Sequence, residues 1–125
     1  MESIKYILTT IKTDLAADMP TLLADANLRN FTVYEIGESR NAKDIGLFVY
    51  KDTYSFSEKE ERLTIIIQAQ LTGTGTIESA AEYEDVILDY FREYSPRKIG
   101  ATSLDQIESD TWPTAQGQGV IIFIY

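Results

Sequence analysis

The chain has 125 residues, neither cysteine nor histidine, and a formal net charge of −9 at pH 7. These absences exclude disulfides, thiolate chemistry, a Ser-His-Asp triad and histidine-ligated metals. The acidic balance argues against nucleic-acid binding by phosphate neutralisation, which needs a basic face.

The length suits one domain, residues 1–125, which would bury about two thirds of the surface of the unfolded chain. The N-terminus shows no basic region followed by an apolar run, so no signal peptide is expected. No stretch approaches the roughly 18 apolar residues that a membrane helix needs. The sequence therefore predicts a cytosolic location and no membrane contact.

The first predicted element is a helix over residues 4–18. Its apolar residues recur at steps of three and four and form one stripe: Ile4, Ile7, Leu8, Ile11, Leu15 and Met19. Pro20 is expected to interrupt this helix, because proline is tolerated in a first turn and not in a helix interior. A short second helical turn over residues 20–27 should follow.

Three strands are expected next, over residues 31–36, 45–50 and 63–71. The second strand has little alternation between polar and apolar residues, which predicts a central strand covered on both faces. The third strand alternates, which predicts a half-buried strand with glutamines outward.

The connection over residues 51–61 is longer than two neighbouring strands need, and it combines Tyr54 and Phe56 with charged residues. Long loops of this kind often bind a partner. An extended hairpin with a merely solvated tip explains the same residues. The sequence leaves both interpretations open.

The segment over residues 70–79 has two glycines between a strand and a helix, so a phosphate site was a hypothesis to test. The dinucleotide fingerprint needs a third glycine where Glu78 stands, and the Walker loop needs a lysine that is absent between Lys59 and Lys98. The segment is therefore interpreted as a turn, with a capping box at Ser79 and Glu82 that begins the next helix.

A second helix is predicted over residues 80–94, ended by Pro96. Residues 98–101 are expected to form a short strand, and residues 102–119 a polar segment that ends in a turn at 116–119. Residues 120–125 form a strand that is apolar on both sides, so it must be central in the sheet or covered.

This order predicts an α+β domain, α-β-β-β-α-β-β, in which two helices pack on a mixed, mainly antiparallel sheet of about four to five strands.

The sequence offers few candidate catalytic or metal-binding residues. Glu78, Glu82, Asp85 and Asp89 lie at helical spacing, but they occupy the face opposite the aromatic residues, so solvation explains them better than a metal site. No acidic residue has a lysine two positions later, as an acid-and-lysine nuclease would need. Carboxylate pairs leave a glycosidase formally open. We expect no catalytic residue, metal or cofactor.

The order of elements resembles the tail terminator, or tail completion, proteins of long-tailed bacteriophages. The matching pieces span nearly the whole chain: the helix and Pro-containing turn over 11–20, the strands over 31–36 and 47–50 with their long acidic loop, the strand over 62–70, the helix over 80–94 and the C-terminal strand.

The resemblance implies a structural ring, usually of six subunits, that caps the tail tube, stops its polymerisation and presents a surface to the head connector protein. It implies assembly in the host cytoplasm and a final place in the virion tail. DNA would pass through the acidic ring without specific binding. The implied assembly contacts are Tyr54, Phe56, Glu58, Glu60, Trp112 and Tyr125.

Three alternatives remain. Another head-tail joining or neck protein would have the same physical properties and would differ only in the ring that it contacts. An acidic inhibitor that mimics DNA would be a monomer or dimer that binds a basic enzyme. A small ligand-binding domain would gain thermal stability from a small molecule.

Overall fold

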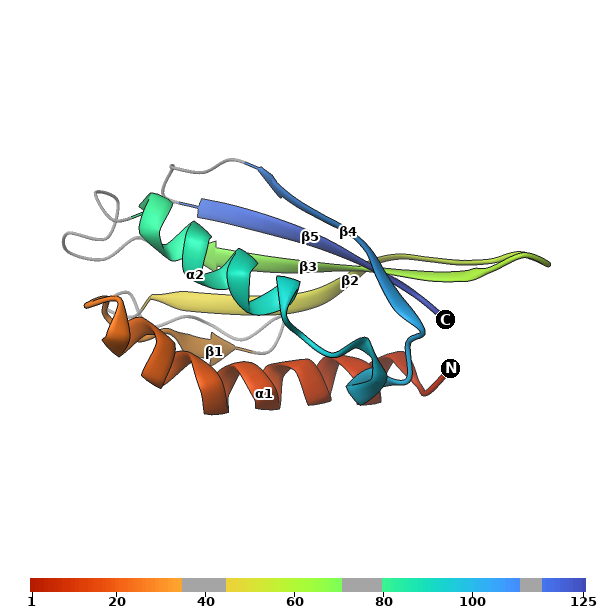
Figure 1. The fold of residues 1–125 in the computed structure, drawn as a ribbon, viewed down its shortest axis with the longest axis horizontal. Coiled ribbons are helices and arrows are strands. Elements are labelled where there is room, and N and C mark those ends of the chain that lie inside the picture. Colours follow the sequence, from red (N-terminus) through yellow and green to blue (C-terminus); the bar gives the residue numbers. More distant parts are fainter. Residues whose placement is uncertain (35–44, 71–79, 111–115) are drawn as a thin grey trace.

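The computed structural model describes residues 1–34, 45–70, 80–110 and 116–125 (Figure 1). Its elements, in chain order, are α1 (Ile4–Asp25), β1 (Thr32–Tyr34), β2 (Gly46–Phe56), β3 (Glu61–Gln70), α2 (Ala80–Arg92), the 3₁₀ helix η2 (Pro96–Ile99), β4 (Ser103–Asp110) and β5 (Gln116–Ile124). This order confirms the predicted α+β arrangement.

The helix α1 continues through Pro20, so the predicted interruption there was wrong. A proline in a helix interior costs about 3 kcal/mol. The apolar stripe, however, extends at steps of four past the proline, and its members are at most 1% exposed: Ile7, Ile11, Leu15, Met19 and Leu23. Burial of a leucine such as Leu23 is worth about 1.5–3 kcal/mol, which offsets the missing backbone bond.

The end of α1 is set by a backbone motif. Asn27 adopts the left-handed conformation with φ of 60°. The N–H of Leu28 donates to the carbonyl of Leu23 at 2.7 Å, and the N–H of Asn27 donates to that of Ala24 at 3.0 Å. These two bonds form a Schellman motif, which satisfies carbonyls that the helix end leaves unpaired.

The sheet has the strand order β1-β2-β3-β5-β4. The pair β1 and β2 is parallel, and every other pair is antiparallel, so the sheet is mixed and mainly antiparallel as predicted. The C-terminal strand β5 lies between β3 and β4, where both of its edges are paired. This position confirms that the apolar C-terminal strand is central.

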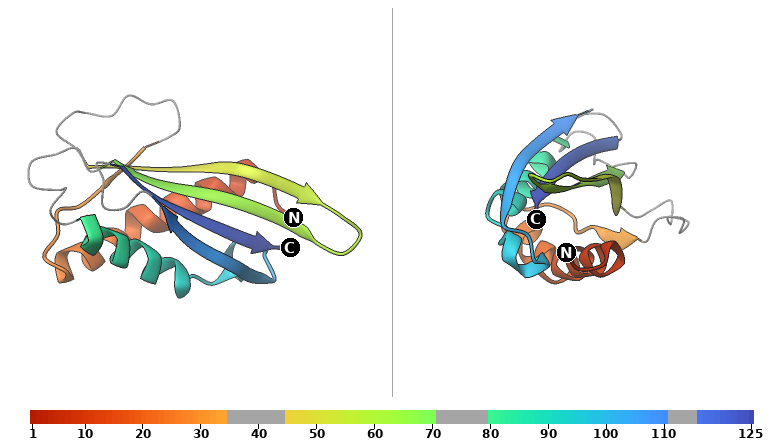
Figure 2. Two further views of the ribbon diagram at one scale, coloured as in Figure 1. Left: turned by 90° about the horizontal axis from the view of Figure 1, so that it is seen from above. Right: turned by 90° about the vertical axis from the view of Figure 1, so that its right-hand side faces the viewer.

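Both helices cover the same face of the sheet (Figure 2). Their buried residues and alternate residues of the strands belong to one cluster, which includes Leu15, Phe91, Ile65, Ile121 and Phe123. The strand period of two directs the intervening residues of β5, Val120, Ile122 and Ile124, to the opposite face, where they are half-buried. The domain therefore consists of two layers.

Three segments differ from the prediction. The strand β2 continues to Phe56, so most of the expected connection over 51–61 is strand. Residues 98–101 are not a strand, because η2 runs to Ile99 and ends at Gly100, whose φ of 74° suits glycine. The polar segment contains the strand β4, and the expected turn at 116–119 is the beginning of β5. These polar residues form strands because β4 pairs with β5 and the beginning of β5 pairs with β3, and the local sequence does not signal this pairing.

Two tyrosine hydroxyls join the helices. Tyr90 donates to Asp18 at 2.8 Å, and Tyr94 donates to Asp14 at 2.6 Å. Burial raises the pKa of both hydroxyls well above 10, and the hydrogen bond to the carboxylate raises it further. These bonds fix α2 antiparallel to α1.

We expect Pro20→Ala to raise the free energy of unfolding by about 1–2 kcal/mol. The change restores a backbone N–H inside α1, and part of the gain is lost because alanine leaves the unfolded chain more flexible. Urea titration followed by circular dichroism measures the effect. An unchanged or lower stability would show that α1 is not continuous at this point.

We expect stability to fall as the pH rises above about 10. In that range the tyrosines of the unfolded chain ionise while Tyr90 and Tyr94 retain their protons in the folded state, so the folded state binds more protons. Urea midpoints measured between pH 8 and 11 should fall more steeply for the natural chain than for the double variant Tyr90→Phe, Tyr94→Phe. Equal slopes would contradict this assignment.

Candidate assembly interface

A hairpin of β2 and β3 projects beyond the two-layer body (Figure 1, Figure 2). We call residues 51–62 the arm. Its residues from Lys51 to Lys59 are all exposed. The strand β5 pairs with β3 as far as Arg62, and the N–H of Tyr125 still donates to Glu61, so only the end of the arm from Phe56 to Glu61 lies beyond β5. A two-stranded ribbon without a covering layer is marginally stable in water, so the arm depends on its own turn and on contacts at its base.

Ser57 organises the turn at the tip. Its N–H donates to the carbonyl of Glu60 at 2.9 Å, and its Oγ accepts from the N–H groups of Lys59 and Glu60 at 3.4 and 3.3 Å. No residue of this turn has a positive φ, so it is not one of the type I′ or II′ turns that short hairpins favour. The serine side chain therefore stabilises a turn whose central residues, Glu58 and Lys59, are not the Asn-Gly pair that is usual in short hairpins.

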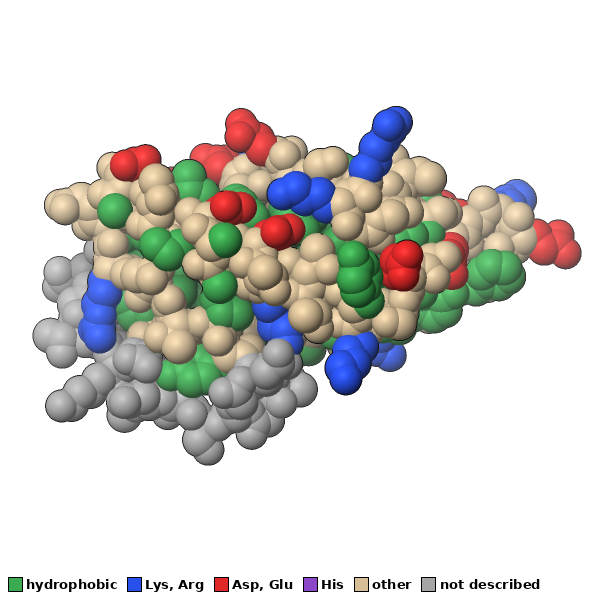
Figure 3. All heavy atoms as spheres, turned by 90° about the horizontal axis from the view of Figure 1, so that it is seen from below, with side chains coloured by type: hydrophobic (Ala, Val, Ile, Leu, Met, Phe, Trp, Pro, Cys, Tyr) green, Lys and Arg blue, Asp and Glu red, His purple; other side chains and the backbone are tan. Residues whose placement is uncertain are grey.

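The arm carries two aromatic side chains. Phe56 is 75% exposed and Tyr54 is 38% exposed. They are two residues apart on one strand, so they share a face. The hydroxyl of Tyr54 donates to Glu61 on the opposite strand, and this bond raises the pKa of Tyr54. Figure 3 shows hydrophobic side chains on the projecting end of the molecule, beside acidic ones.

Arg62 fastens the base of the arm. Its guanidinium donates to Glu60 at 2.9 Å and to Asp105 of β4 at 2.8 Å. The three side chains are between about a third and two fifths exposed, so each ion pair contributes at most about 1 kcal/mol. The pairs restrain the direction of the arm more than they stabilise the domain.

Tyr125 lies beside the arm. Its N–H donates to the carbonyl of Glu61 at 2.8 Å. Its hydroxyl is buried and, within the described residues, has no hydrogen-bond partner. Burial and the charge of Glu61 raise the pKa of Tyr125. A buried hydroxyl without a partner costs free energy.

The predicted interface residues gather at this end of the molecule, with one exception. Tyr54, Phe56, Glu58 and Glu60 all lie on the arm, and Tyr125 contacts its base. Glu58 is exposed in the turn, whereas Glu60 turns back to Arg62. Trp112 lies outside the described residues. Residues 51–61 form an extended hairpin, and partner binding by its tip stays a prediction.

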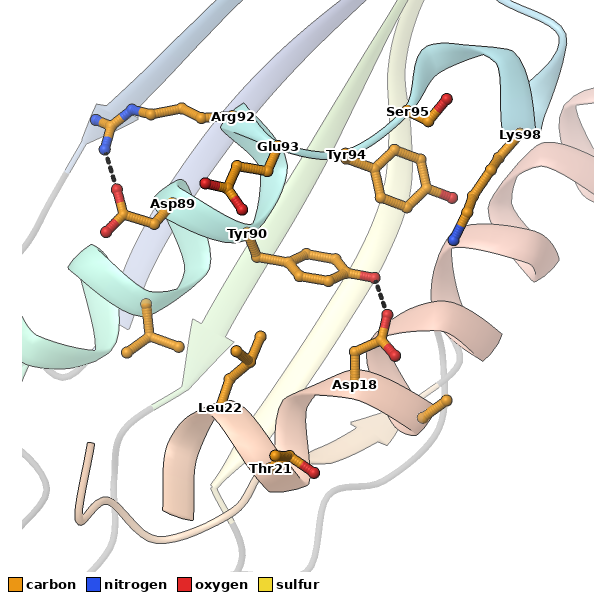
Figure 4. A pocket seen from close by; sticks show the side chains of 12 residues that line it. Asp18, Thr21, Leu22, Asp89, Tyr90, Arg92, Glu93, Tyr94, Ser95 and Lys98 are labelled. Carbon is orange, nitrogen blue, oxygen red and sulfur yellow. Dashed lines mark hydrogen bonds and ion pairs between the residues drawn. The ribbon is translucent and has the colours of Figure 1, made fainter. Parts of the chain in front are cut away.

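A second feature was not predicted. A groove of about 950 Å³ lies between α1 and α2 (Figure 4). The expected interruption at Pro20 concealed it, because half of its α1 side comes after the predicted helix end. In the sequence, Asp14, Asp18, Leu22 and Asp25 recur at steps of four and three, so they share one face of a continuous helix. This pattern could have indicated that side of the groove.

The described residues contain no group of three or more potential metal-ligating side chains. The described helices include none that is both long and apolar enough to cross a membrane. The glycine-containing segment over 71–79 and Ser79 of the expected capping box lie outside the described residues.

Comparison of the chain with protein-family models and with curated proteins finds no match.

We expect Phe56→Ala to change the free energy of unfolding by less than about 0.5 kcal/mol, because its ring is exposed. Phe123→Ala, at a position that is 0% exposed, should cost about 3–5 kcal/mol. Urea denaturation of both variants makes the comparison. A large loss of stability in Phe56→Ala would show that this ring belongs to the folded core and is not available for contact.

Proposed function

We propose that this protein is a structural subunit of a ring, a tail terminator of a long-tailed bacteriophage, without catalytic activity. The observation that carries the proposal is the arm: a restrained hairpin that projects from the body and holds Phe56 largely in water. Exposed aromatic side chains of this kind are typical anchors of protein interfaces.

A projecting arm suits a contact between two different surfaces of neighbouring copies. Such heterologous contacts produce a closed ring when the rotation between copies closes. The arm is attached through Arg62 and through the pairing of β3 with β5, so its direction is defined before assembly. Little ordering would then be needed on contact, which lowers the entropic cost of association.

The ring would contact the tail tube protein on one side and the head connector protein on the other, first in the host cytoplasm and then in the virion tail. The net charge of −9 supports passage of DNA through such a ring, because the phosphates find little counter-charge to bind. The absence of histidine and cysteine supports a structural role, because it removes the commonest general base and the thiol nucleophile.

The proposal predicts a ring-sized oligomer that depends on the arm. Light scattering after size-exclusion chromatography, over a range of concentrations and with purified tail tubes where available, should give a mass of about six subunits. Negative-stain images should show a central hole. The double variant Tyr54→Ser, Phe56→Ser should lower the assembled fraction at least about tenfold while remaining folded.

Tyr6→Ser is the matched control, because Tyr6 is a 52% exposed aromatic residue of α1 that lies outside both the arm and the groove. This variant should assemble normally. A monomer both alone and on tail tubes, or equal assembly by the arm variant and the natural chain, would contradict the proposal.

A further inference from the structure

The groove between α1 and α2 has a regular construction. The helices run antiparallel, and Asp14 meets Tyr94 while Asp18 meets Tyr90. Four residues further along α1, Leu22 lines the same groove as Val86, which lies four residues before Tyr90 on α2. These steps are one helical turn each, so the groove follows the two helix axes.

The floor of the groove is apolar. It includes Leu22, which is 38% exposed, and the half-buried Val86 and Tyr90. Figure 4 shows Leu22 from α1 and Tyr90 from α2 directed toward the space between the helices. An exposed leucine beside half-buried apolar side chains leaves a strip that a partner's side chains can cover.

Three carboxylates and two cations line the groove: Asp18, Asp89 and Glu93, with Arg92 and Lys98. On the α2 side, the exposed Glu82 and Asp85 continue the line of Asp89 and Glu93 at steps of three and four. A line of carboxylates therefore follows the α2 side of the apolar strip.

The cations of the groove are already engaged. Arg92 pairs with Asp89 at 2.5 Å, and Lys98 lies 3.9 Å from Asp14 and over the ring of Tyr94. Within the described ranges, no ion pair involves Glu82, Asp85 or Glu93. These three carboxylates are available to a positively charged partner.

We propose that this groove binds a basic amphipathic helix of another protein. Such a helix would place apolar residues at i, i+3, i+4 and i+7 on the strip and lysine or arginine residues beside the line of carboxylates on α2. From Val86 to Glu93 the groove is about 10 Å long, which corresponds to about two turns of the bound helix. The hydroxyls of Tyr90 and Tyr94 are satisfied within the protein and do not call for a polar ligand.

A second copy of this chain does not fit the groove. Its helix α2 carries four carboxylates and one arginine, and α1 carries three carboxylates and two lysines, so both would bring net negative charge to the line of carboxylates on α2. A compact small molecule fits poorly as well, because exposed residues such as Asp18, Thr21 and Glu93 leave the groove open to solvent along its length.

The inference does not depend on the proposed ring. The probe is a fluorescently labelled synthetic peptide of 14 residues with leucines at i, i+3, i+4 and i+7 and lysines beside them. A scrambled peptide of the same composition is its control. Anisotropy gives the affinity, and ¹⁵N chemical-shift mapping locates the site. The arm variant Tyr54→Ser, Phe56→Ser serves as host protein and should bind equally well.

We expect the shifts to be confined to residues 14–25 and 82–98, and the affinity to exceed that of the scrambled peptide at least about tenfold. Leu22→Ala should weaken binding about tenfold. Glu93→Gln should weaken it about two- to fivefold, whereas Glu58→Gln, which removes the same charge from the arm, should not.

Equal binding of the scrambled peptide, shifts centred on the arm or on the sheet face opposite the helices, or no effect of Leu22→Ala would overturn the proposal. Equal losses for Glu93→Gln and Glu58→Gln would also overturn it, because they would reduce the interaction to general attraction between opposite net charges.

Discussion

The apolar face that β3 and β5 share is the surface on which the rest of the molecule is built. Alternate residues of these two central strands, Leu63, Ile65 and Ile67 on one and Ile121 and Phe123 on the other, are at most 1% exposed. Both helices pack their buried stripes against this face. Because strand residues alternate between faces, a one-residue slip between β3 and β5 would move all of these side chains out of the core.

The same pairing defines the arm. The strand β3 extends past the last residue of β5, and β2 accompanies it to the turn at Ser57. Beyond that point no second layer covers the hairpin, and Phe56 is left in water. A feature of this kind adds nothing to the core, so its restrained direction is best understood through contact with another chain.

The helices form a second surface with different chemistry. Tyr90 of α2 and Tyr94, just beyond its end, bond to carboxylates of α1, and these bonds fix the spacing that leaves the groove open. The arm presents aromatic residues, whereas the groove presents an apolar strip between carboxylates. Two surfaces so different in chemistry suit two different partners, which agrees with a component that joins other structures.

The sequence by itself determined the order of elements, the central place of the C-terminal strand and the location of the exposed aromatic residues Tyr54 and Phe56. These features follow from local periodicity and from the solubility cost of an uncovered apolar strand. The continuity of α1 through Pro20 and the strands in polar segments were decided by tertiary structure. Leu23 is buried only because the sheet lies beneath it, and β4 with the start of β5 is held by neighbouring strands whose contribution no local pattern records. The groove likewise depends on tertiary structure: the step from Asp14 to Asp18 and Leu22 signalled one of its sides, but the groove exists only where Asp18 and Tyr90, 72 residues apart, meet.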